Sequence, residues 1–344
     1  MVRSKRSTLV AVAERAGVSI ASVSRVLNGL ATSDDVRQRV EQAAFELAYV
    51  PDAFARSLKS GRTEQIAFAV ADVGNPVYVR MMHAVSSVLS AAGFRLVLSS
   101  TGNDPDEQLD VVRNANRGFA DGLIVVPLRL TPALLDELST TRLPVAVIGS
   151  LPDGMHLDNV RADSAAGVGL AMDHLHATGR RRIAFVNGPV DTVPGTNRLA
   201  GYLAAAGRLG LATSAEMQVQ ADDFTYDAGL AAAAALLDQA NPDAIVCAND
   251  LLAVATLKVL HRRGRRVPDD VAVVGMDDTE LTELVHPSLT SVDLRSRERA
   301  TEAARLLLGR LAEPSLEARQ VAMAPALTIR ESSAPTAEQR AVLT

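Results

Sequence analysis

Residues 9–28 read LVAVAERAGVSIASVSRVLN, and this stretch decides the organisation of the chain. Two small residues, Ala13 and Ala16, predict the inner face of a short helix. Gly17 then supplies a tight turn, where a positive φ angle is expected. Ser19 stands at the N-cap position of a second helix. The buried side of that second helix is expected at Val23, Val26 and Leu27.

The second helix leaves several polar side chains available for contact with nucleic acid. A helix-turn-helix places its second helix in the DNA major groove, where exposed donors meet phosphates and base edges. The candidates are Arg25 and the hydroxyls of Ser19, Ser22 and Ser24. An ordinary pair of core helices would show the same local pattern, so these residues alone leave both alternatives open.

Further motifs extend this pattern beyond the two helices. They are Gly17-Val18-Ser19, VSRVLNG at 23–29, LAYVP at 47–51 and ARSL at 55–58. In this order they resemble the DNA-binding end of the LacI/GalR family of bacterial transcription repressors, and the resemblance continues to about Ser332. It implies a homodimer that binds double-stranded operator DNA and is controlled by a small-molecule effector.

The resemblance also implies a division of roles among the residues of the second helix. Ile20 and Ala21 occupy the positions that select the operator. Because both are small and apolar, we expect them to contact thymine methyl groups. Arg25 is expected to contact a guanine edge. Phosphate contacts are expected from Ser19, Ser22, Ser24 and Asn28.

Residues 34–49 carry apolar side chains at helical spacing and predict a third helix that supports the first two. Residues 51–64 follow as a short hinge helix and linker, and a helix of this length is marginal in isolation. The resemblance implies that the hinge folds in the DNA minor groove. There Leu58 enters between base pairs, at a cost of roughly a few kcal/mol per step. Ala55 and Arg56 are the accompanying hinge contacts.

Two observations weaken this interpretation of the hinge. Leu58 also suits an ordinary linker residue that packs against its neighbours. Asp52 stands where many relatives have Asn. It places a carboxylate near phosphates, which weakens that local contact.

The distribution of charge and cysteine narrows the class of protein. Residues 1–62 hold ten Lys/Arg and six Asp/Glu, so they carry +4, whereas the remainder carries −9 and the whole chain −5. A basic head on an acidic body suits docking of one end on phosphates. Cys247, the single cysteine, lies in an apolar run and is expected in a buried strand. One cysteine forms no internal disulfide, and no signal peptide or membrane-length apolar run is recognisable, so we expect a cytoplasmic protein.

Short apolar runs alternate with helical patterns from Gln65 onward. One series of strands is expected at 66–71, 95–98, 122–126 and 145–148, with helices at about 76–92, 105–117 and 132–140. A second series is expected at 183–186, 217–219, 244–247 and 271–274. Such alternation predicts parallel sheets flanked by helices. The predicted fold class is an N-terminal all-α helix-turn-helix head plus an α/β core, two-lobed like the periplasmic-binding-protein type I fold.

These boundaries divide the chain into a head (1–50), the hinge and linker (51–64), a core (65–332) and a tail (333–344). The resemblance implies that the chain crosses between the lobes near residues 163, 292 and 322. Lobe one then comprises about 65–163 and 293–321, and lobe two about 164–292 and 322–332. The tail lacks the leucine heptads that tetramerise some relatives, so a dimer is expected.

Polar residues at the ends of the predicted strands mark a candidate ligand site, because ligands of open parallel sheets bind beyond the carboxyl ends of the strands. In lobe one these residues are Asp72, Asn75 and Tyr78. Carboxylate and amide groups bind sugar hydroxyls, and a ring offers a stacking surface. Local helix capping is the alternative for Asp72 and Asn75.

In lobe two the resemblance assigns effector contacts to Arg198, Phe224, Asn249 and Asp277. A solvated helix arginine is the alternative for Arg198. The combined set of carboxylates, amides, guanidinium and rings suits a neutral polyhydroxylated ligand. A sugar or sugar derivative is therefore favoured over a purine or an amino acid. Thr192, Val193 and Pro194 stand where purine-binding relatives have other residues.

Two charged or ligating patterns have simpler explanations. The run HRRGRR at 261–266 suits the C-terminus of a helix better than a DNA contact. His174 and His176 have no further ligand at metal spacing, so neither a metal nor a cofactor is expected. Nucleotide-binding and nucleophile motifs are not recognisable, which disfavours an enzyme. A corepressor, or much less readily a solute-binding protein, remains the alternative to an effector-released repressor.

Overall fold

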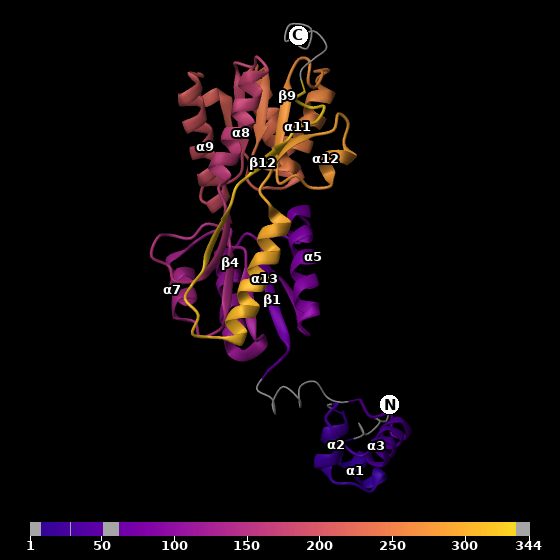
Figure 1. The fold of residues 1–344 in the computed structure, drawn as a ribbon. Coiled ribbons are helices and arrows are strands. Elements are labelled where there is room, and N and C mark those ends of the chain that lie inside the picture. The colour runs from indigo at the N-terminus through magenta and orange to yellow at the C-terminus, as the bar shows by residue number, and fades with distance from the viewer. Residues whose placement is uncertain (1–7, 28, 51–61, 335–344) are drawn as a thin grey trace. The chain divides into compact units, whose positions relative to one another are not determined.

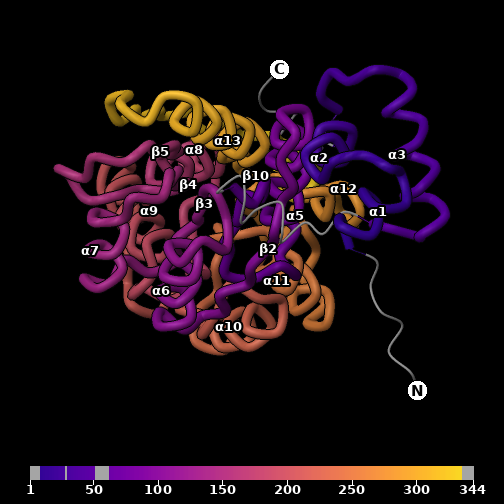
Figure 2. The backbone as a smooth tube through the Cα atoms, turned by 90° about the horizontal axis from the view of Figure 1, so that it is seen from below, coloured from indigo at the N-terminus to yellow at the C-terminus, as the bar shows by residue number. Residues whose placement is uncertain are grey.

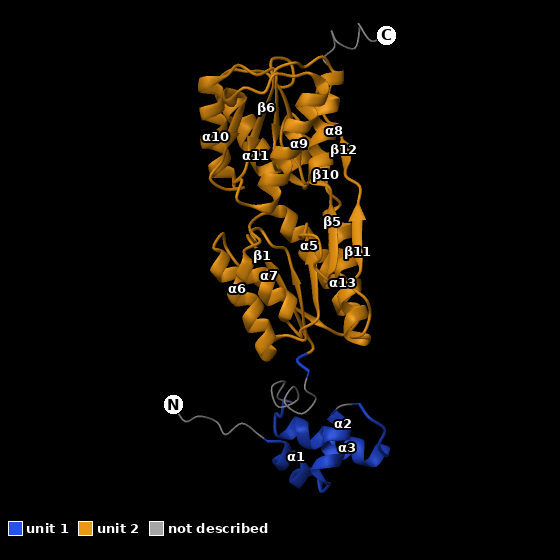
Figure 3. Ribbon diagram, turned by 90° about the vertical axis from the view of Figure 1, so that its left-hand side faces the viewer, with its two compact units in different colours: residues 1–63 blue, residues 64–344 orange. Residues whose placement is uncertain are grey.

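The computed structural model describes residues 8–27, 29–50 and 62–334 (Figure 1). Contacts divide the chain into two compact units, residues 1–63 and 64–344 (Figure 3). Several predictions of the sequence fall outside the described residues: Asn28, Asp52, Ala55, Arg56, Leu58 and most of the tail.

The smaller unit contains three helices, α1 (Leu9–Ala16), α2 (Ile20–Leu27) and α3 (Asp34–Glu46). The side chain of Thr8 caps α1 by accepting a hydrogen bond from the backbone N–H of Ala11 at 3.2 Å. Gly17 ends α1 with φ of 66°, which confirms the predicted turn. Helix α3 ends three residues earlier than predicted, and Ala48 beyond it has φ of 44°. The buried hydrophobic core of this unit consists of Val12, Ala13, Ala16, Val23, Val40 and Ala43.

The larger unit contains two six-stranded sheets, which lie in separate lobes (Figure 1). The first sheet has the order β11-β5-β4-β3-β1-β2, and the second has the order β12-β10-β9-β8-β6-β7. The paired strands are parallel except β10 and β12, which are antiparallel. The strands are β1 (Gln65–Val70), β2 (Arg95–Ser100), β3 (Gly122–Val125), β4 (Val145–Ile148), β5 (Asp158–Ala162), β6 (Ile183–Asn187), β7 (Gln218–Gln220), β8 (Ala244–Cys247), β9 (Ala272–Met276), β10 (Thr290–Asp293), β11 (Gln320–Met323) and β12 (Ala326–Thr328).

Helices cover both faces of the sheets, as the alternating pattern predicts. They are α5 (Pro76–Ala91), α6 (Pro105–Asn114), α7 (Pro132–Thr140), α8 (Ser164–Ala177), α9 (Val193–Leu209), α10 (Tyr226–Gln239), α11 (Asp250–Arg262), α12 (Leu281–Leu284) and α13 (Ser296–Ala312). Ile66 and Phe68 of β1 pack with α5 and α13, whereas Ala67 and Ala69 face the cluster that includes α6 and α7. This alternation follows the two-residue period of a strand. Figure 2 shows α13 and α6 on opposite sides of β3 and β4.

The four strands predicted in each lobe are present, with ends that differ by a few residues. The sequence pattern did not predict β5, β10, β11 and β12. The first residue of β5, Asp158, is acidic. The structure buries this carboxylate and pairs it with Arg310 and Arg319 at 3.1 and 3.0 Å. The helix predicted at 105–117 ends at Asn114 and continues as a π-helical turn, in which Gly118 has φ of 89°.

Cys247 is fully buried in β8, as predicted. Burial raises the pKa of its thiol to about 12. A thiol that stays protonated at neutral pH is a poor nucleophile. Cys247 is therefore a core residue.

Candidate functional site

The outer surface of α2 carries the residues predicted to read DNA. The Ser19 hydroxyl accepts a hydrogen bond from the backbone N–H of Ser22 at 3.1 Å, so it caps the helix as predicted. Ile20 is 48% exposed, and Ala21 and Arg25 are also exposed. Val23 is fully buried on the other side of the helix. The exposed side chains therefore project from a helix that the small core anchors.

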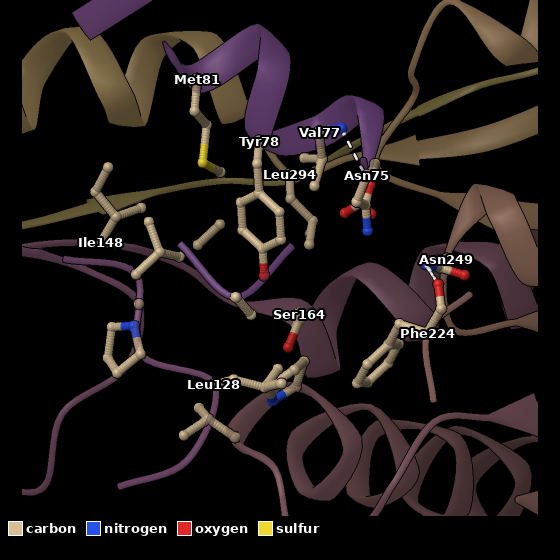
Figure 4. Close-up of a pocket in the computed structure, with 18 of the residues that line it drawn as sticks. Asn75, Val77, Tyr78, Met81, Leu128, Ile148, Ser164, Phe224, Asn249 and Leu294 are labelled. Carbon is tan, nitrogen blue, oxygen red and sulfur yellow. Dashed lines mark hydrogen bonds between the residues drawn. The ribbon is translucent and has the colours of Figure 1, made fainter. Parts of the chain in front are cut away.

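A pocket lies between the two lobes of the larger unit (Figure 4). It encloses about 910 Å³, part of it open to solvent. All of the predicted effector residues line it: Asp72, Asn75, Tyr78, Arg198, Phe224, Asn249 and Asp277. The structure thus brings together residues that lie more than 200 positions apart, and their contact with a ligand stays a prediction.

The first lobe contributes the start of α5 and the turn before it. Asn75 caps this helix, because its Oδ1 accepts from the backbone N–H of Val77 at 3.1 Å. Asp72 is exposed, and one of its carboxylate oxygens accepts from the backbone N–H of Gly74 at 2.7 Å. Tyr78 points its hydroxyl toward the pocket (Figure 4). Burial and nearby carboxylates raise its pKa to about 12, so the phenol is a neutral hydrogen-bond donor.

In the second lobe, α9 carries Arg198, which is only 8% exposed. Its Nη1 donates to the carbonyl of Ala248 at 2.6 Å, and its Nη2 lies 3.7 Å from Oδ1 of Asp277. The guanidinium also lies 5.7 Å from the centre of the Phe224 ring, a cation–π contact. That ring requires Gly188, since a Cβ there would come within 2.3 Å of it. Arg198 is a fixed part of the pocket wall.

Asn249 supports the pocket wall as well as lining it. Its Oδ1 caps α11 by accepting from the backbone N–H of Leu252 at 2.9 Å. Its Nδ2 donates to the carbonyl of Phe224 at 2.8 Å (Figure 4). Both ends of the amide are therefore bonded within the protein, and the residue fixes the backbone that carries the ring.

Asp277 lies in a tight loop after β9, where its φ is 103°. The neighbouring carboxylate of Asp250 holds this loop: it accepts from the N–H and hydroxyl of Thr279 at 2.7 and 2.8 Å, and from the hydroxyl of Ser291 at 2.6 Å. Burial and the charge of Asp277 raise the pKa of Asp250 to about 7. Burial also raises the pKa of Asp277, although the positive charges of Arg198 and Arg299 oppose this.

Sequence reasoning missed four polar residues of the pocket: Ser150, Ser164, Asn197 and Arg299. Arg299 is only 8% exposed, although it lies on α13. Burial lowers its pKa to about 10. The signal was present in the sequence, since Arg299 interrupts a stripe at helical spacing with Ser296, Ala300 and Ala303. A charged residue on a buried stripe needs an explanation.

The basic run at 261–266 and the pair His174 and His176, for which the sequence favours simpler explanations, do not line this pocket. The Nε2 of His174 is 2.8 Å from the hydroxyl of Ser333, and burial lowers the pKa of the imidazole. Arg263 and Arg266 pair with Asp238 and Asp270 at 2.6 and 2.7 Å. Among the described residues, we find no group of three or more His, Cys, Asp or Glu side chains arranged for a metal ion. No helix in the same part of the chain could span a membrane.

A helix-turn-helix unit joined to a two-lobed unit with a polar pocket defines a DNA-binding regulator with a ligand-binding core. Comparisons with known proteins agree. Residues 8–52 match the model for bacterial regulatory proteins of the lacI family, and residues 172–333 match that for a periplasmic binding protein-like domain.

Individual relatives match over almost the whole chain. The HTH-type transcriptional regulator CelR of Thermobifida fusca is 38% identical, covering 96% of this chain and all of the relative. The ribose operon repressor of Escherichia coli (strain K12) is 31% identical, covering 95% of this chain and all of the repressor. The chain therefore belongs to the LacI family of bacterial transcriptional regulators.

Solved structures give the same result for the fold. A complex of the transcriptional regulator CelR with cellobiose has a TM-score of 0.72 at 35% identity, over 95% of this chain and all of that one. The lac repressor dimer bound to operator and the anti-inducer ONPF has a TM-score of 0.84 at 26% identity, over 96% of this chain and 99% of the other.

Proposed function

We propose that this protein is a homodimeric repressor of carbohydrate-utilisation genes, which a sugar-type effector releases from a palindromic operator. The observation that carries this proposal is the polar pocket between the lobes, combined with the exposed face of α2. The relatives that bind operator DNA or cellobiose, by their descriptions, support it. A regulator of this kind acts in the bacterial cytoplasm and is not an enzyme.

In the DNA-bound state, α2 of each protomer lies in a major groove. Arg25 donates to a guanine edge, and Ile20 and Ala21 contact thymine methyl groups. Phosphate contacts come from Ser19, Ser22, Ser24 and Asn28. The hinge residues Ala55, Arg56 and Leu58 enter the minor groove between the two half-sites.

In the ligand-bound state, the effector closes the two lobes on each other. Asp72, Asn75 and Tyr78 contact it from the first lobe. Arg198, Phe224, Asn249 and Asp277 contact it from the second lobe. The chain crosses between the lobes near residues 163, 292 and 322. The assignment of β5 and β11 to the first sheet and of β10 to the second supports this division. Closure therefore moves the chain next to the hinge, and the effector stabilises the conformation that does not bind DNA.

The experiment that tests this function is capture of sheared genomic DNA by the purified protein, followed by sequencing. Enrichment of a short palindrome with a central C-G step is the expected result, and the neighbouring genes nominate the sugar. Titration of the enriched site with that sugar then gives the sign of the effect. Weaker DNA binding supports release by the effector, whereas tighter binding would replace it with corepression.

Two outcomes would overturn the proposal. If no DNA fragment is enriched with or without cell extract, the head does not act as a repressor. If the purified protein converts the sugar to a product, the protein is an enzyme.

A further inference from the structure

The pocket contains two buried arginines that differ in their partners. Arg198 donates to the carbonyl of Ala248, lies 3.7 Å from the carboxylate of Asp277 and contacts the Phe224 ring. Arg299 is equally buried, at 8% exposure, and among the described residues the Nε atoms of both arginines lack a hydrogen-bond acceptor. Arg299 also forms no salt bridge of 4.0 Å or less within the part of the chain that the structure describes.

An unpaired buried guanidinium is unfavourable for folding, because desolvation of its charge is not repaid by a partner. Ala300, Ala303 and Leu307 follow on the same buried stripe of α13. An apolar side chain would continue this stripe, whereas the side chain of Arg299 lines the pocket.

The pocket has an excess of buried positive charge. Asp277 is the carboxylate nearest to Arg198. Asp72 is exposed and already accepts from the backbone of Gly74. Tyr78 stays neutral, since its pKa is about 12. Two guanidinium groups, those of Arg198 and Arg299, therefore share the negative charge of Asp277 in the buried part of the pocket, and one positive charge is in excess.

We infer that the effector is a sugar acid with one carboxylate, which accepts two hydrogen bonds from the guanidinium of Arg299. This inference rests on the proposed function and replaces the neutral sugar that the sequence favours. The planar fork of an arginine matches a carboxylate with two parallel hydrogen bonds. The hydroxyls of Ser164 and Tyr78 lie at the pocket (Figure 4) and would bind the ligand's hydroxyl groups. Asn197 also lines the pocket and offers its amide to the same groups.

The same charges disfavour a sugar phosphate. A phosphate monoester carries close to two negative charges at neutral pH. Of the two buried arginines of the pocket, only Arg198 forms a salt bridge among the described residues, and Asp72 and Asp277 line the same pocket. A second negative charge would face these carboxylates without a second available cation. A monoanion balances the site.

The test is isothermal titration calorimetry of the full-length protein with matched pairs of probes. The pairs are D-glucose and D-glucuronate, D-galactose and D-galacturonate, and cellobiose and cellobionate, with glucose 6-phosphate as the dianionic probe. We expect at least one acid to bind about 100-fold more tightly than its neutral parent. Arg299→Met removes most of that difference. Arg297→Met, an exposed position on the same helix, is the matched control and leaves the affinity unchanged.

A second measurement does not depend on the identity of the sugar. Without ligand, Arg299→Met raises the midpoint of thermal unfolding, because a buried unpaired charge is removed, whereas Arg297→Met leaves it in place. Arg299→Lys keeps the charge but not the fork, and retains only part of the preference for the acid.

The outcomes separate this inference from the proposed function. If a neutral sugar binds as tightly as its acid and weakens operator binding, the inference is wrong and the repressor function stands. Tighter binding of glucose 6-phosphate than of the sugar acids would also contradict the inference that the effector carries a single carboxylate. If no probe binds while the protein still binds its operator, the proposal of a sugar-type effector is wrong, and so is the inference of a sugar acid.

Discussion

The surface of α2 and the pocket of the larger unit use similar side chains in opposite environments. Arg25 of α2 is exposed, so its charge stays hydrated until DNA replaces the water. Arg198 and Arg299 are each only 8% exposed. The charge of a buried arginine must therefore be balanced by the protein or by a ligand.

This difference explains why the two sites respond differently to substitution. On α2, removal of an exposed side chain is expected to subtract one of the proposed contacts with DNA and to leave the fold intact. In the pocket, removal of one charge leaves another buried charge without its partner. We therefore expect effects in the pocket to couple to stability, whereas those on α2 do not.

The largest effect is expected in the core of the head, where few residues support α2. Val40 is fully buried among six hydrophobic residues, so Val40→Asp buries an unpaired carboxylate at a cost of about 3–5 kcal/mol. We expect the head to unfold and DNA binding to be lost. Ligand binding to the full-length protein is retained, because the pocket is formed by residues of the other unit. Fluorescence anisotropy with operator DNA and calorimetry with ligand measure the two activities.

The matched control for this variant is Gln38→Asp, which adds the same charge at an exposed position of α3. It should leave the thermal unfolding of the head nearly unchanged. Equal loss of DNA binding and of ligand binding in Val40→Asp would contradict the independence of the two units.

The second effect concerns the paired arginine of the pocket. Arg198→Met removes the partner of Asp277 and the cation over Phe224, with an expected loss of about 3–4 kcal/mol in ligand binding. Because Arg198 also lowers the pKa of Asp277, its removal raises that pKa further. Calorimetry gives the affinity for the ligand, and the pH dependence of that affinity reports the titration of Asp277. Arg208→Met, an exposed position of α9, is the control; an equal effect there would exclude a specific role for Arg198.

The third effect is a pH dependence of stability that originates at Asp250. Its folded pKa of about 7 lies above the ordinary pKa of an aspartate, 3.8, so the folded protein binds the proton more tightly than the unfolded chain. This stabilisation is fully present below about pH 4 and is lost as the pH rises through about 7. It amounts to at most about 4 kcal/mol. Urea unfolding between pH 4 and 8 measures it.

Asp250→Asn isolates this contribution from other titrating groups, such as His174, whose pKa is lowered by burial. The amide cannot accept from Thr279 and Ser291 in the same way, so the variant is less stable overall. The informative quantity is the slope of the free energy of unfolding against pH. A slope identical to that of the wild type would show that Asp250 does not titrate in this range.

The two regions also differ in how far the sequence predicts them. The turn at Gly17, the cap at Ser19 and the buried Val23 follow from local spacing, because they depend on neighbours within one or two turns. The pocket residues of the first lobe, Asp72, Asn75 and Tyr78, were predicted because they follow the end of a strand. Those of the second lobe were predicted from the family resemblance: Arg198, Phe224, Asn249 and Asp277. Arg299 was missed, since it reaches the pocket only after the chain has crossed between the lobes. The second role of Asn249 was also missed, because it depends on the backbone position of Phe224.

The smallest effect is expected from a change in the base preference of α2. The contribution of phosphate contacts to DNA affinity should stay unchanged. Ile20→Gln with Ala21→Gln replaces two apolar contacts by amides that favour adenine. Each altered base position is expected to change the preference by about 1–3 kcal/mol. Both positions are exposed, so the head remains folded. Selection from a randomised operator library measures the preferred bases for the variant and the wild type.

The salt dependence of binding provides the control for this experiment. The slope of log affinity against log salt counts the phosphate contacts, which the proposed function assigns to other residues of the head and the hinge. It should therefore be nearly equal in the double variant and the wild type. Unchanged base preference would exclude Ile20 and Ala21 as the residues that select the operator. A changed slope with unchanged preference would assign them to the backbone of the DNA, and α2 would then lie in the groove in a different orientation.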